Sequence, residues 1–469
     1  MEEKENLSAT ENTRRKINRN ALLSILCATV LIITFFLGYF VRGYSEPAYA
    51  QKINEIIKLI NSMSVYSSDK DADTLAKYLL KELLKDDKYA YYYTAEEYKR
   101  MIAEDGGNYS GLGVGFSSDG QIVRVYLNSP AYNNGQGLKE GDKLFAGTYK
   151  GDENYTVFDQ KLAEENAGKA DSEKKSILDI YAEFLSEFDF GEDIKLQVLR
   201  DSETLEFTFA KAQYTVSYVE YKDSEKNFYY FSGENGIESK TPDGASGISG
   251  LSPDTAYIKL HAFEGGAAMQ FAGALEFMRE RGKTKLILDL RDNGGGLINV
   301  LLDIASYIIN DNGSDEIRIL NVKEKDASVH YSTPVNRFYG GTDRLTDISV
   351  IANKNTASAS ECLIGALNDY GDTELFSGAA FSLDRLILTE QDDDGVYRTF
   401  GKGIMQTTIK LNTGGALKLT TAYIYWPKSR DEENNPICIQ DVGIRTEVLE
   451  NRVSDEDAIS RADYVLHAA

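Results

Sequence analysis

The sequence predicts a multidomain protein of the α/β (α+β) class. It would have an N-terminal transmembrane helix, a helical segment, a small and mostly β module, and a layered α/β core. Three observations predict this architecture: an uncharged apolar run near the N-terminus, short alternating apolar runs from about residue 111, and alternating strand-like and helix-like segments from residue 254 onward. The chain has 469 residues, 42% of them hydrophobic, enough for roughly two to four domains of about 100–200 residues each.

Residues 21–41 form the predicted membrane anchor. This run, ALLSILCATVLIITFFLGYFV, has 21 residues and no charge; as a helix it would span roughly 31 Å, close to the hydrocarbon thickness of a bilayer. The positive-inside bias places residues 1–20 in the cytoplasm as a tail and the remainder outside it, because four basic residues lie close before the run: Arg14, Arg15, Lys16 and Arg19. A signal peptide cleaved near Ala48-Tyr49-Ala50 is the alternative.

Residues 48–103 are predicted to be mainly helical. The segments INEIIKLI and LAKYLLKELL have the apolar spacing of helices, and TAEEYKRMI begins with a capping box. Short alternating apolar runs then predict a mostly β module over residues 104–213, with a charged and partly helical insertion at about 151–190.

Residues 214–450 are predicted to form the α/β core, and residues 451–469 a C-terminal tail or helix. The strand KLILDLR (285–291) is continuously apolar, as expected where both faces of a sheet are buried. A glycine run and the helix LINVLLDIASYII follow it, and the strand DISVIAN (347–353) precedes the helix SASECLIGALNDYG. This alternation predicts a layered sheet.

The composition excludes several functions. The net charge of −23, from 74 acidic and 51 basic residues, argues against a nucleic-acid partner. Three cysteines cannot form a disulfide framework, and the three histidines lack the spacing of a zinc site. We therefore expect neither a metal nor another cofactor.

The sequence also argues against two common sets of catalytic residues. The three histidines do not suit a Ser-His-Asp triad, since one follows a strand, one lies in a polar stretch and one is at the tail: His261, His330 and His467. Two segments match the Ser-x-x-Lys half of a penicillin-binding pattern, but the Lys-Thr-Gly half is absent: Ser67–Lys70 and Ser172–Lys175.

A serine-rich turn and a lysine between two glycines remain. The turn NTASASE (355–361) joins a predicted buried strand to a helix. A serine there can be a simple helix cap, as Ser360 would be, but free N–H groups at a helix start can also hold a developing oxyanion. Lys402 is either a solvated loop residue or, if it is buried beside a serine, a base whose pKa desolvation lowers toward neutrality.

Eight motifs occur in the order that one peptidase family shows: TAEEYKRM (94–101), SGLGVGF (110–116), SPA (129–131), GLKEGDKL (137–144), LDLRDNGGG (288–296), TASASE (356–361), GKGIMQ (401–406) and ALKLTTAYIYWP (416–427). Over about residues 50–460 the sequence resembles the carboxy-terminal processing peptidases, also called tail-specific proteases. These are Ser/Lys-dyad serine peptidases with an embedded PDZ domain, and the resemblance implies a core similar to the crotonase-like superfold. Each motif is weak alone, whereas the ordered set is specific.

The resemblance implies three catalytic residues: Ser358 as nucleophile, Lys402 as general base, and Gln406, which orients the lysine. It also implies six supporting residues: an oxyanion hole from the backbone amides of Ala359 and Gly295, support of the site by Asp369, and a carboxylate-binding PDZ loop at Leu112, Gly113 and Val114 that receives a substrate by β-augmentation.

Besides the insertion at about 151–190, two segments depart from the family pattern. The approach to Lys402 is longer than usual and carries the acidic run EQDDDG (390–395), which predicts either altered positioning of the lysine or an added hairpin over the site. GIRTEV (443–448) replaces the usual Gly-Ile-x-Pro-Asp. Neither departure removes a residue of the dyad.

The sequence thus predicts a membrane-anchored, extracytoplasmic serine endopeptidase of the C-terminal processing type. It would cut polypeptides that its PDZ domain recognises by an apolar C-terminus, with activity gated by PDZ movement, and a homo-oligomer is compatible with the sequence. The alternative is a non-catalytic, membrane-anchored PDZ scaffold that uses the same peptide groove. The retained set Ser358, Lys402 and Gln406 favours the enzyme, because a scaffold has no physical need for it.

Overall fold

The computed structural model describes residues 48–63, 72–169, 174–225, 228–232, 238–240, 247–338, 345–376 and 378–468. The chain divides into two compact units, residues 1–78 and 79–469. Within the first unit lie the helix α2 (Ala48–Met63) and the beginning of α3 (Ala72–Leu83). In the described part of the chain, no helix is both long and apolar enough to cross a membrane. The predicted tail and anchor, residues 1–20 and 21–41, lie outside the described residues.

Residues 48–103 contain the predicted helices and one short strand that was not predicted. Helix α4 (Ala95–Asp105) begins with the expected capping box, in which the N–H of Glu97 donates to the Thr94 hydroxyl at 3.2 Å and the N–H of Thr94 donates to the Glu97 carboxylate at 2.7 Å. The short strand β1 (Tyr91–Tyr93) was not predicted; it pairs with a strand far along the chain. Tyrosine favours strands, and this long-range pairing is not visible in local apolar spacing.

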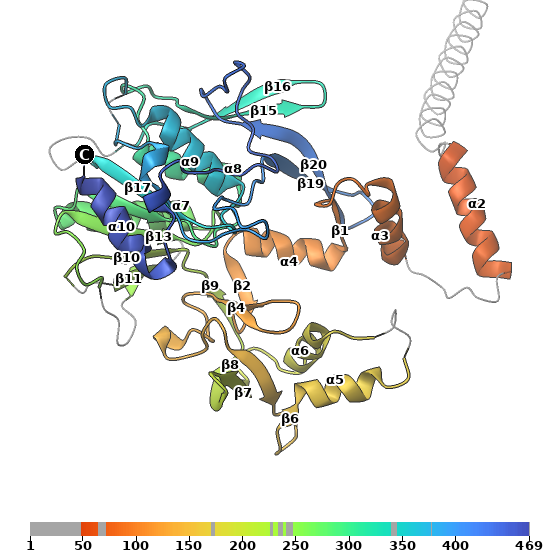
Figure 1. Cartoon of the computed structure of the whole chain (residues 1–469). Helices are drawn as coiled ribbons and strands as arrows, with labels where there is room; N and C mark the ends of the chain where they lie inside the picture. Colours follow the sequence, from red (N-terminus) through yellow and green to blue (C-terminus); the bar gives the residue numbers. More distant parts are fainter. Residues whose placement is uncertain are drawn as a thin grey trace, which may run out of the picture. The chain divides into compact units, whose positions relative to one another are not determined.

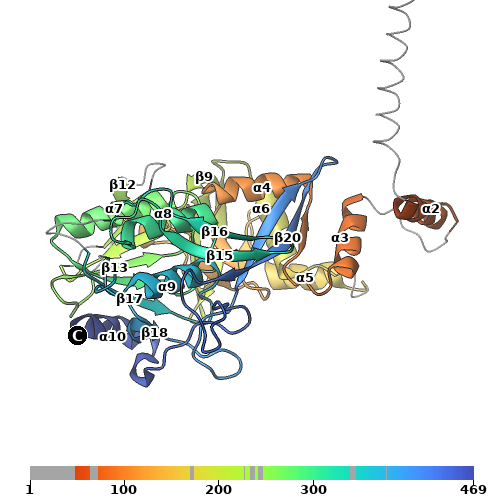
Figure 2. The ribbon, with the colours of Figure 1, turned by 90° about the horizontal axis from the view of Figure 1, so that it is seen from above.

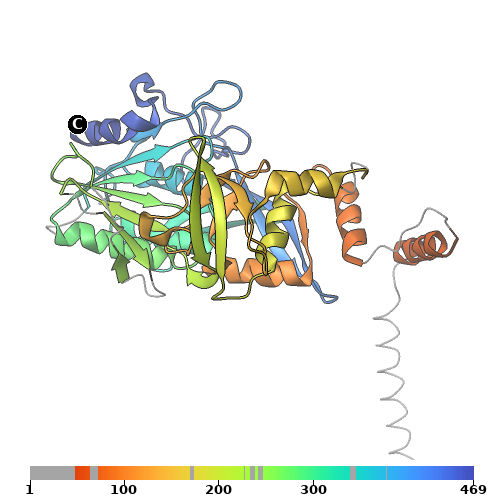
Figure 3. The same ribbon diagram turned by 90° about the horizontal axis from the view of Figure 1, so that it is seen from below.

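The β module consists of three small sheets, with strand orders β6-β5-β7-β8, β3-β4 and β2-β9. Its strands are β2 (Asn108–Gly111), β3 (Val114–Phe116), β4 (Ile122–Val125), β5 (Lys143–Gly147), β6 (Thr156–Val157), β7 (Asp193–Arg200), β8 (Glu203–Ala210) and β9 (Ala212–Thr215). The predicted insertion supplies α5 (Phe158–Asn166) and α6 (Ile177–Ser186), seen in yellow beside the β7–β8 hairpin in Figure 3. Six side chains of residues 151–190 lie in the hydrophobic core of the module, so this segment is an integral part of it.

A seven-stranded sheet of order β12-β11-β10-β13-β14-β17-β18 forms the centre of the α/β core (Figure 1). Its strands are β10 (Val219–Lys222), β11 (Phe228–Ser232), β12 (Glu238–Lys240), β13 (Thr255–Leu260), β14 (Lys285–Asp289), β17 (Asp347–Ala352) and β18 (Leu386–Leu388). Strands β13, β14, β17 and β18 run parallel, whereas β10 is antiparallel to β13. Parallel strands place their carboxyl ends, and the loops that follow them, at one edge of the sheet.

Both faces of this sheet are buried, as the continuous apolar strand predicts. In β14, Leu286 and Leu288 belong to one hydrophobic cluster and Ile287 to another. The first cluster includes α7 (Ala267–Glu280), α8 (Ile298–Ile308) and α9 (Ala359–Tyr370), and the second includes α10 (Asp455–His467). Figure 2 shows α7 and α8 on one side of the sheet and α10 on the other.

A second, antiparallel sheet carries the loop of Lys402. Its strands are β1, β15 (Arg318–Glu324), β16 (Ser328–Ser332), β19 (Ile404–Lys410) and β20 (Ala416–Tyr425), in the order β1-β20-β15-β16 with β19 also paired to β20. Because β19 begins two residues after Lys402, the β19–β20 hairpin fixes where this lysine emerges.

Candidate active site

A cavity of about 670 Å³ lies where three loops of the core meet. One loop follows β14 and contains Gly294–Gly296; the second joins β17 to α9 and ends at Ser358; the third precedes β19 and carries Lys402. Gln406 lines the same cavity from β19. Four residues predicted from the sequence are therefore brought together: Ser358, Lys402, Gln406 and Gly295.

Ser358 has a strained backbone, with φ 58° and ψ −116°. A residue other than glycine in such a region costs on the order of 1–3 kcal/mol and persists only where its surroundings enforce it. Ser358 is the N-cap of α9, where backbone N–H groups and the helix dipole favour negative charge. The predicted cap, Ser360, lies inside α9 instead, and its hydroxyl donates to the carbonyl of Asn293 at 3.0 Å.

The Lys402 loop packs tightly against residues 440–443. A Cβ on Gly401 would lie 2.9 Å from the nitrogen of Gly443, and one on Gly403 would lie 2.6 Å from the nitrogen of Gln440. The N–H of Gly403 donates to the side-chain oxygen of Gln440 at 2.9 Å. The two glycines are therefore needed for close backbone approach, as their flanking positions suggested.

Gln406 and Lys402 are in direct contact. Lys402 Nζ donates to Gln406 Oε1 at 3.1 Å, and Gln406 Nε2 donates to the carbonyl of Tyr89 at 2.8 Å. Within the described residues, Ser358 Oγ and Lys402 Nζ form no direct hydrogen bond, although both line the cavity. Loose contacts of this kind are common before substrate binds.

Burial lowers the pKa of Lys402 below its ordinary value, and the charge of Lys418 in the same cavity lowers it further. The charge of Glu361 opposes this shift. A lowered pKa increases the fraction of neutral amine available to accept a proton near neutral pH.

Glu361 connects the serine and lysine segments, a role that the sequence analysis did not assign. This buried carboxylate accepts from the N–H groups of Ser358 at 2.8 Å, Gly401 at 2.8 Å and Lys402 at 2.9 Å. The hydroxyl of Thr399 donates to it at 2.5 Å. Burial raises the pKa of Glu361, and these hydrogen bonds oppose the rise. The signal was present as Ser-x-x-Glu, the capping-box spacing, but nothing local predicted the partners forty residues away.

The two predicted oxyanion donors differ in whether their N–H group already donates a hydrogen bond. The N–H of Ala359 donates to no protein acceptor among the residues that the structure describes. The N–H of Gly295, by contrast, donates to Asn293 Oδ1 at 2.9 Å. Gly295 nevertheless lies directly against the serine, because a Cβ there would be 2.8 Å from both the nitrogen of Ala359 and the Cβ of Ser358.

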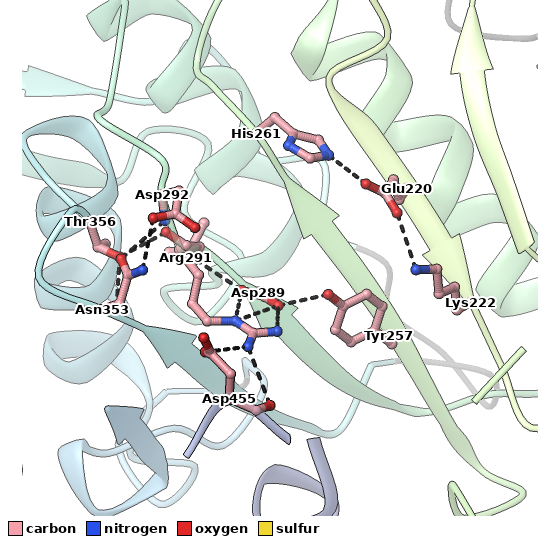
Figure 4. Close-up of polar contacts among 11 residues, drawn as sticks. Glu220, Lys222, Tyr257, His261, Asp289, Arg291, Asp292, Asn353, Thr356 and Asp455 are labelled. Atoms are coloured by element: carbon pink, nitrogen blue, oxygen red, sulfur yellow. Dashed lines mark hydrogen bonds and ion pairs between the residues drawn. The ribbon is translucent and has the colours of Figure 1, made fainter. Parts of the chain in front are cut away.

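A polar network fixes the loop after β14 (Figure 4). The buried carboxylate of Asp289 accepts from the guanidinium of Arg291 and from the Tyr257 hydroxyl at 2.7 Å. Arg291 also donates to Asp455 at 2.7 Å and so ties the loop to α10. Asp292, with φ 62°, accepts from the amide of Asn353 at 2.9 Å. The loop is thus anchored to its neighbours on both sides.

A histidine that lines the cavity, His261, is paired with a glutamate. His261 Nε2 is 2.6 Å from Glu220 Oε1, and Glu220 is 3.3 Å from Lys222 Nζ (Figure 4). Burial lowers the pKa of His261, while the glutamate opposes the shift. His261 follows β13, as predicted, whereas Glu220 lies in β10. Among the described residues, neither side chain forms a hydrogen bond or ion pair with Ser358.

Other predicted site residues lie elsewhere. Asp369, near the end of α9, accepts from the N–H groups of Lys428 at 2.6 Å and Ser429 at 2.9 Å and does not line the cavity. The predicted hairpin before Lys402 is present as a turn in which Gln391 pairs with Tyr397. It is held to the carbonyls of residues 441 and 442 by an arginine, Arg398, and does not line the cavity.

The loop at residues 112–114 lies in the β module. Leu112 is buried, and Gly113 has φ 86° with no room for a side chain, because a Cβ would lie 2.2 Å from the Cβ of Ser129. Val114 begins β3 and pairs with Val125. Within the described residues, the N–H groups of Leu112 and Gly113 donate to no protein acceptor.

Comparisons with known proteins relate this chain to peptidases. The family described as peptidase family S41 matches residues 254–382, a range that contains the Gly295 loop and Ser358. A protein of Staphylococcus aureus named "Probable CtpA-like serine protease" is 24% identical over 426 residues, which cover 88% of this chain and 70% of that protein. The chloroplastic carboxyl-terminal-processing peptidase 3 of Arabidopsis thaliana is 32% identical over 212 residues, 45% of this chain and 33% of that protein.

Among solved structures, a photosystem II D1 C-terminal processing protease matches over 83% of this chain and 84% of that chain, with 19% sequence identity and a TM-score of 0.43. The sequence matches define the class of protein: this chain is a serine-type peptidase. The same matches support the family that the ordered motifs predicted, the carboxy-terminal processing peptidases of family S41.

Proposed function

We propose that the chain is an endopeptidase of the C-terminal processing type that cuts polypeptides with a Ser358–Lys402 dyad. One observation carries this proposal. A single buried carboxylate, that of Glu361, accepts from the backbone N–H groups of both residues, at 2.8 and 2.9 Å. The two side chains line one cavity, and the two segments that carry them are held as a unit.

In the proposed reaction, the Ser358 hydroxyl attacks the scissile carbonyl carbon while the neutral amine of Lys402 takes its proton. The resulting ammonium gives this proton to the leaving amine as the C–N bond breaks, which leaves an acyl-enzyme. A water molecule, deprotonated by Lys402, then attacks the ester carbonyl. The ester C–O bond to Ser358 breaks, the Lys402 ammonium returns the proton to the serine oxygen, and the new carboxyl end is released. The lowered pKa of Lys402 suits the first step, because the neutral amine is the reactive form.

The backbone would stabilise the oxyanion. The N–H of Ala359 is available at the start of α9, where the helix dipole adds to its effect. For Gly295 to act as the second donor, its N–H must exchange Asn293 Oδ1 for the substrate oxygen. Asp369 would act at a distance, by holding the turn at residues 428–429.

The β module would act as a PDZ domain that receives the C-terminus of the substrate. The unengaged N–H groups of Leu112 and Gly113 are suited to a carboxylate, and the edge of β3 that is not paired with β4 would pair with an extended peptide. From the sequence we further propose a single membrane span at residues 21–41, with residues 1–20 in the cytoplasm and the peptidase outside it.

The test is cleavage of an unstructured reporter that ends in apolar residues. The full chain is compared with Ser358→Ala, Lys402→Ala and the control Lys410→Ala, which alters an exposed lysine at the end of the same strand, β19. We expect cleavage by wild type and by Lys410→Ala, and none by the two dyad variants. Cleavage by Ser358→Ala would show that another residue is the nucleophile.

The alternative function, a PDZ scaffold without catalysis, has a separate signature. Wild type would bind the reporter through its C-terminus and leave it intact under all conditions. Blocking the C-terminal carboxylate of the reporter as an amide should weaken binding in either case, because the carboxylate is the group that the 112–114 loop would recognise.

A further inference from the structure

The segment Asp87–Tyr89 lies behind the predicted base, outside the matched range 254–382. It follows α3 and precedes β1, and it contacts the side chains of both Gln406 and Lys402. We propose that this segment, through Tyr89, is the positioning element that sets the side chain of Lys402 for catalysis. The inference rests on the proposed function, because it assumes that Lys402 is the base.

The carbonyl of Tyr89 fixes the orientation of the Gln406 amide. Gln406 Nε2 donates to this carbonyl at 2.8 Å, so the opposite end of the amide, Oε1, is turned toward Lys402 Nζ at 3.1 Å. A primary amide has one donor end and one acceptor end. If the carbonyl of Tyr89 moved, the amide could rotate and present N–H groups to the ammonium, which has no acceptor of its own.

The ring of Tyr89 provides a second contact. Lys402 Nζ lies 5.0 Å from the ring centroid, within the range of a cation–π interaction. The ring therefore attracts the protonated lysine that forms after the serine gives up its proton. The Tyr89 hydroxyl is buried and has no hydrogen-bond partner in the described part of the chain, so only the ring is used.

Asp87 holds the segment against β20. Its carboxylate accepts from the N–H of Thr420 and from the Thr420 hydroxyl, both at 2.9 Å, and from the N–H of Tyr89 at 3.2 Å. Strand β1 then continues along β20, where Tyr91 pairs with Lys418. The position of Tyr89 is thus set on both sides, and Asp87 is the anchor nearest to it.

A consequence follows for control of the enzyme. The serine, its oxyanion loop and the lysine all come from residues 290–406, yet the lysine is oriented by a segment that enters more than three hundred residues earlier in the chain. A partner that displaced the end of α3 would therefore alter the position of Lys402 through its contacts with Tyr89 and Gln406. The proposed base is therefore complete only when the segment before β1 is docked.

Two substitutions of Tyr89 distinguish the role of its aromatic ring from that of its hydroxyl. Tyr89→Leu removes the ring, whereas Tyr89→Phe keeps it and deletes only the unpartnered hydroxyl. In the full chain we expect Tyr89→Leu to lower kcat by about 10- to 100-fold with KM unchanged, as for a misplaced catalytic group. Tyr89→Phe should match wild type in kcat. Equal kcat for all three proteins would overturn the role of the ring.

The anchor is tested by Asp87→Asn against Asp86→Asn, an exposed neighbour on the same turn. Asp87→Asn should lower kcat, and Asp86→Asn should not. If Asp87 acts through the Gln406 amide, its effect should disappear in a Gln406→Ala background. Full additivity of the two substitutions would contradict this route. Thermal unfolding of each variant shows whether a loss merely reflects unfolding.

A measurement independent of cleavage distinguishes failure of this inference from failure of the proposed function. The rate at which an amine-directed reagent labels Lys402, followed by peptide mapping, should rise in Tyr89→Leu and stay unchanged in Tyr89→Phe. If wild type cuts nothing, the proposed function fails, while a changed labelling rate still supports the positioning role. If wild type cuts and labelling and kcat are both unchanged in Tyr89→Leu, the positioning role alone is wrong.

Discussion

Gly295→Ala should remove activity without unfolding the protein. The added Cβ would lie 2.8 Å from the nitrogen of Ala359, 2.8 Å from the Cβ of Ser358 and 2.9 Å from the carbonyl oxygen of Ala357. Ordinary contacts begin at about 3.4 Å, so each neighbour must retreat by about 0.6 Å. All three atoms belong to the serine turn, and the displacement therefore falls on the nucleophile itself.

The expected magnitude has a stability part and a catalytic part. Alanine at φ 98° costs on the order of 1–3 kcal/mol, and the overpacking adds about 1–3 kcal/mol, part of which the loop relieves by shifting. That loss is tolerable against a total stability of about 5–15 kcal/mol. Loss of an oxyanion donor lowers kcat by about 100- to 1,000-fold, and displacement of the serine acts in the same direction.

The neighbouring residue supplies a matched control. A Cβ on Gly294 would meet nothing within 4 Å, and Gly294 is not among the residues with positive φ. Gly294→Ala should therefore keep nearly wild-type cleavage of the reporter. The assay is kcat for the reporter, with thermal unfolding measured in parallel. If Gly295→Ala kept more than a third of the wild-type kcat, the placement of Gly295 beside the nucleophile would be refuted.

Three further predictions follow from the same contacts. Lys418→Gln removes a like charge that lowers the pKa of Lys402, so the rising limb of the pH–kcat profile should move to higher pH; an unmoved limb would exclude this coupling. Glu361→Gln removes a charge that raises that pKa, so the limb should move to lower pH, with a lower maximum because at least one backbone N–H loses its acceptor. Gly113→Ala should weaken binding of a peptide C-terminus at least tenfold, since the Cβ would overlap Ser129, while cleavage of a peptide too short to reach the module should persist; unchanged peptide affinity would argue against this loop as the carboxylate site.

The sequence was informative where local pattern and long-range structure agree. The continuous apolar run of β14 predicted a strand buried on both faces, and its residues do alternate between two hydrophobic clusters. The glycines on either side of Lys402 predicted close backbone approach. This is confirmed, because a Cβ at either position would lie only 2.6 or 2.9 Å from a backbone nitrogen. The family followed from the order of eight motifs rather than from any single one.

The sequence was uninformative where a role depends on distant partners. Glu361 has the spacing of a capping box, but its partners at residues 399–402 come from another loop. Strand β1 consists of three tyrosines that pair with residues 416–418, and no local signal marks that pairing. The engagement of the Gly295 N–H by Asn293 likewise depends on a side-chain rotation, which a motif does not encode.

Glu361 has two opposing effects on the site: it holds the catalytic segments together, and it raises the pKa of Lys402. Other features of the site offset the second effect. Glu361 must be buried and ionised to hold the Ser358 and Lys402 segments together, yet its charge also favours the protonated, unreactive form of Lys402. Burial of the amine and the charge of Lys418 act in the opposite direction, and their combined effect is larger, since the net shift of the lysine pKa is downward. Without Lys418, Glu361 would still hold the two segments together, but a smaller fraction of Lys402 would be the neutral amine. On this argument Lys418 supports the proposed chemistry by adding to the effect of burial on the Lys402 pKa, although it need never touch a substrate.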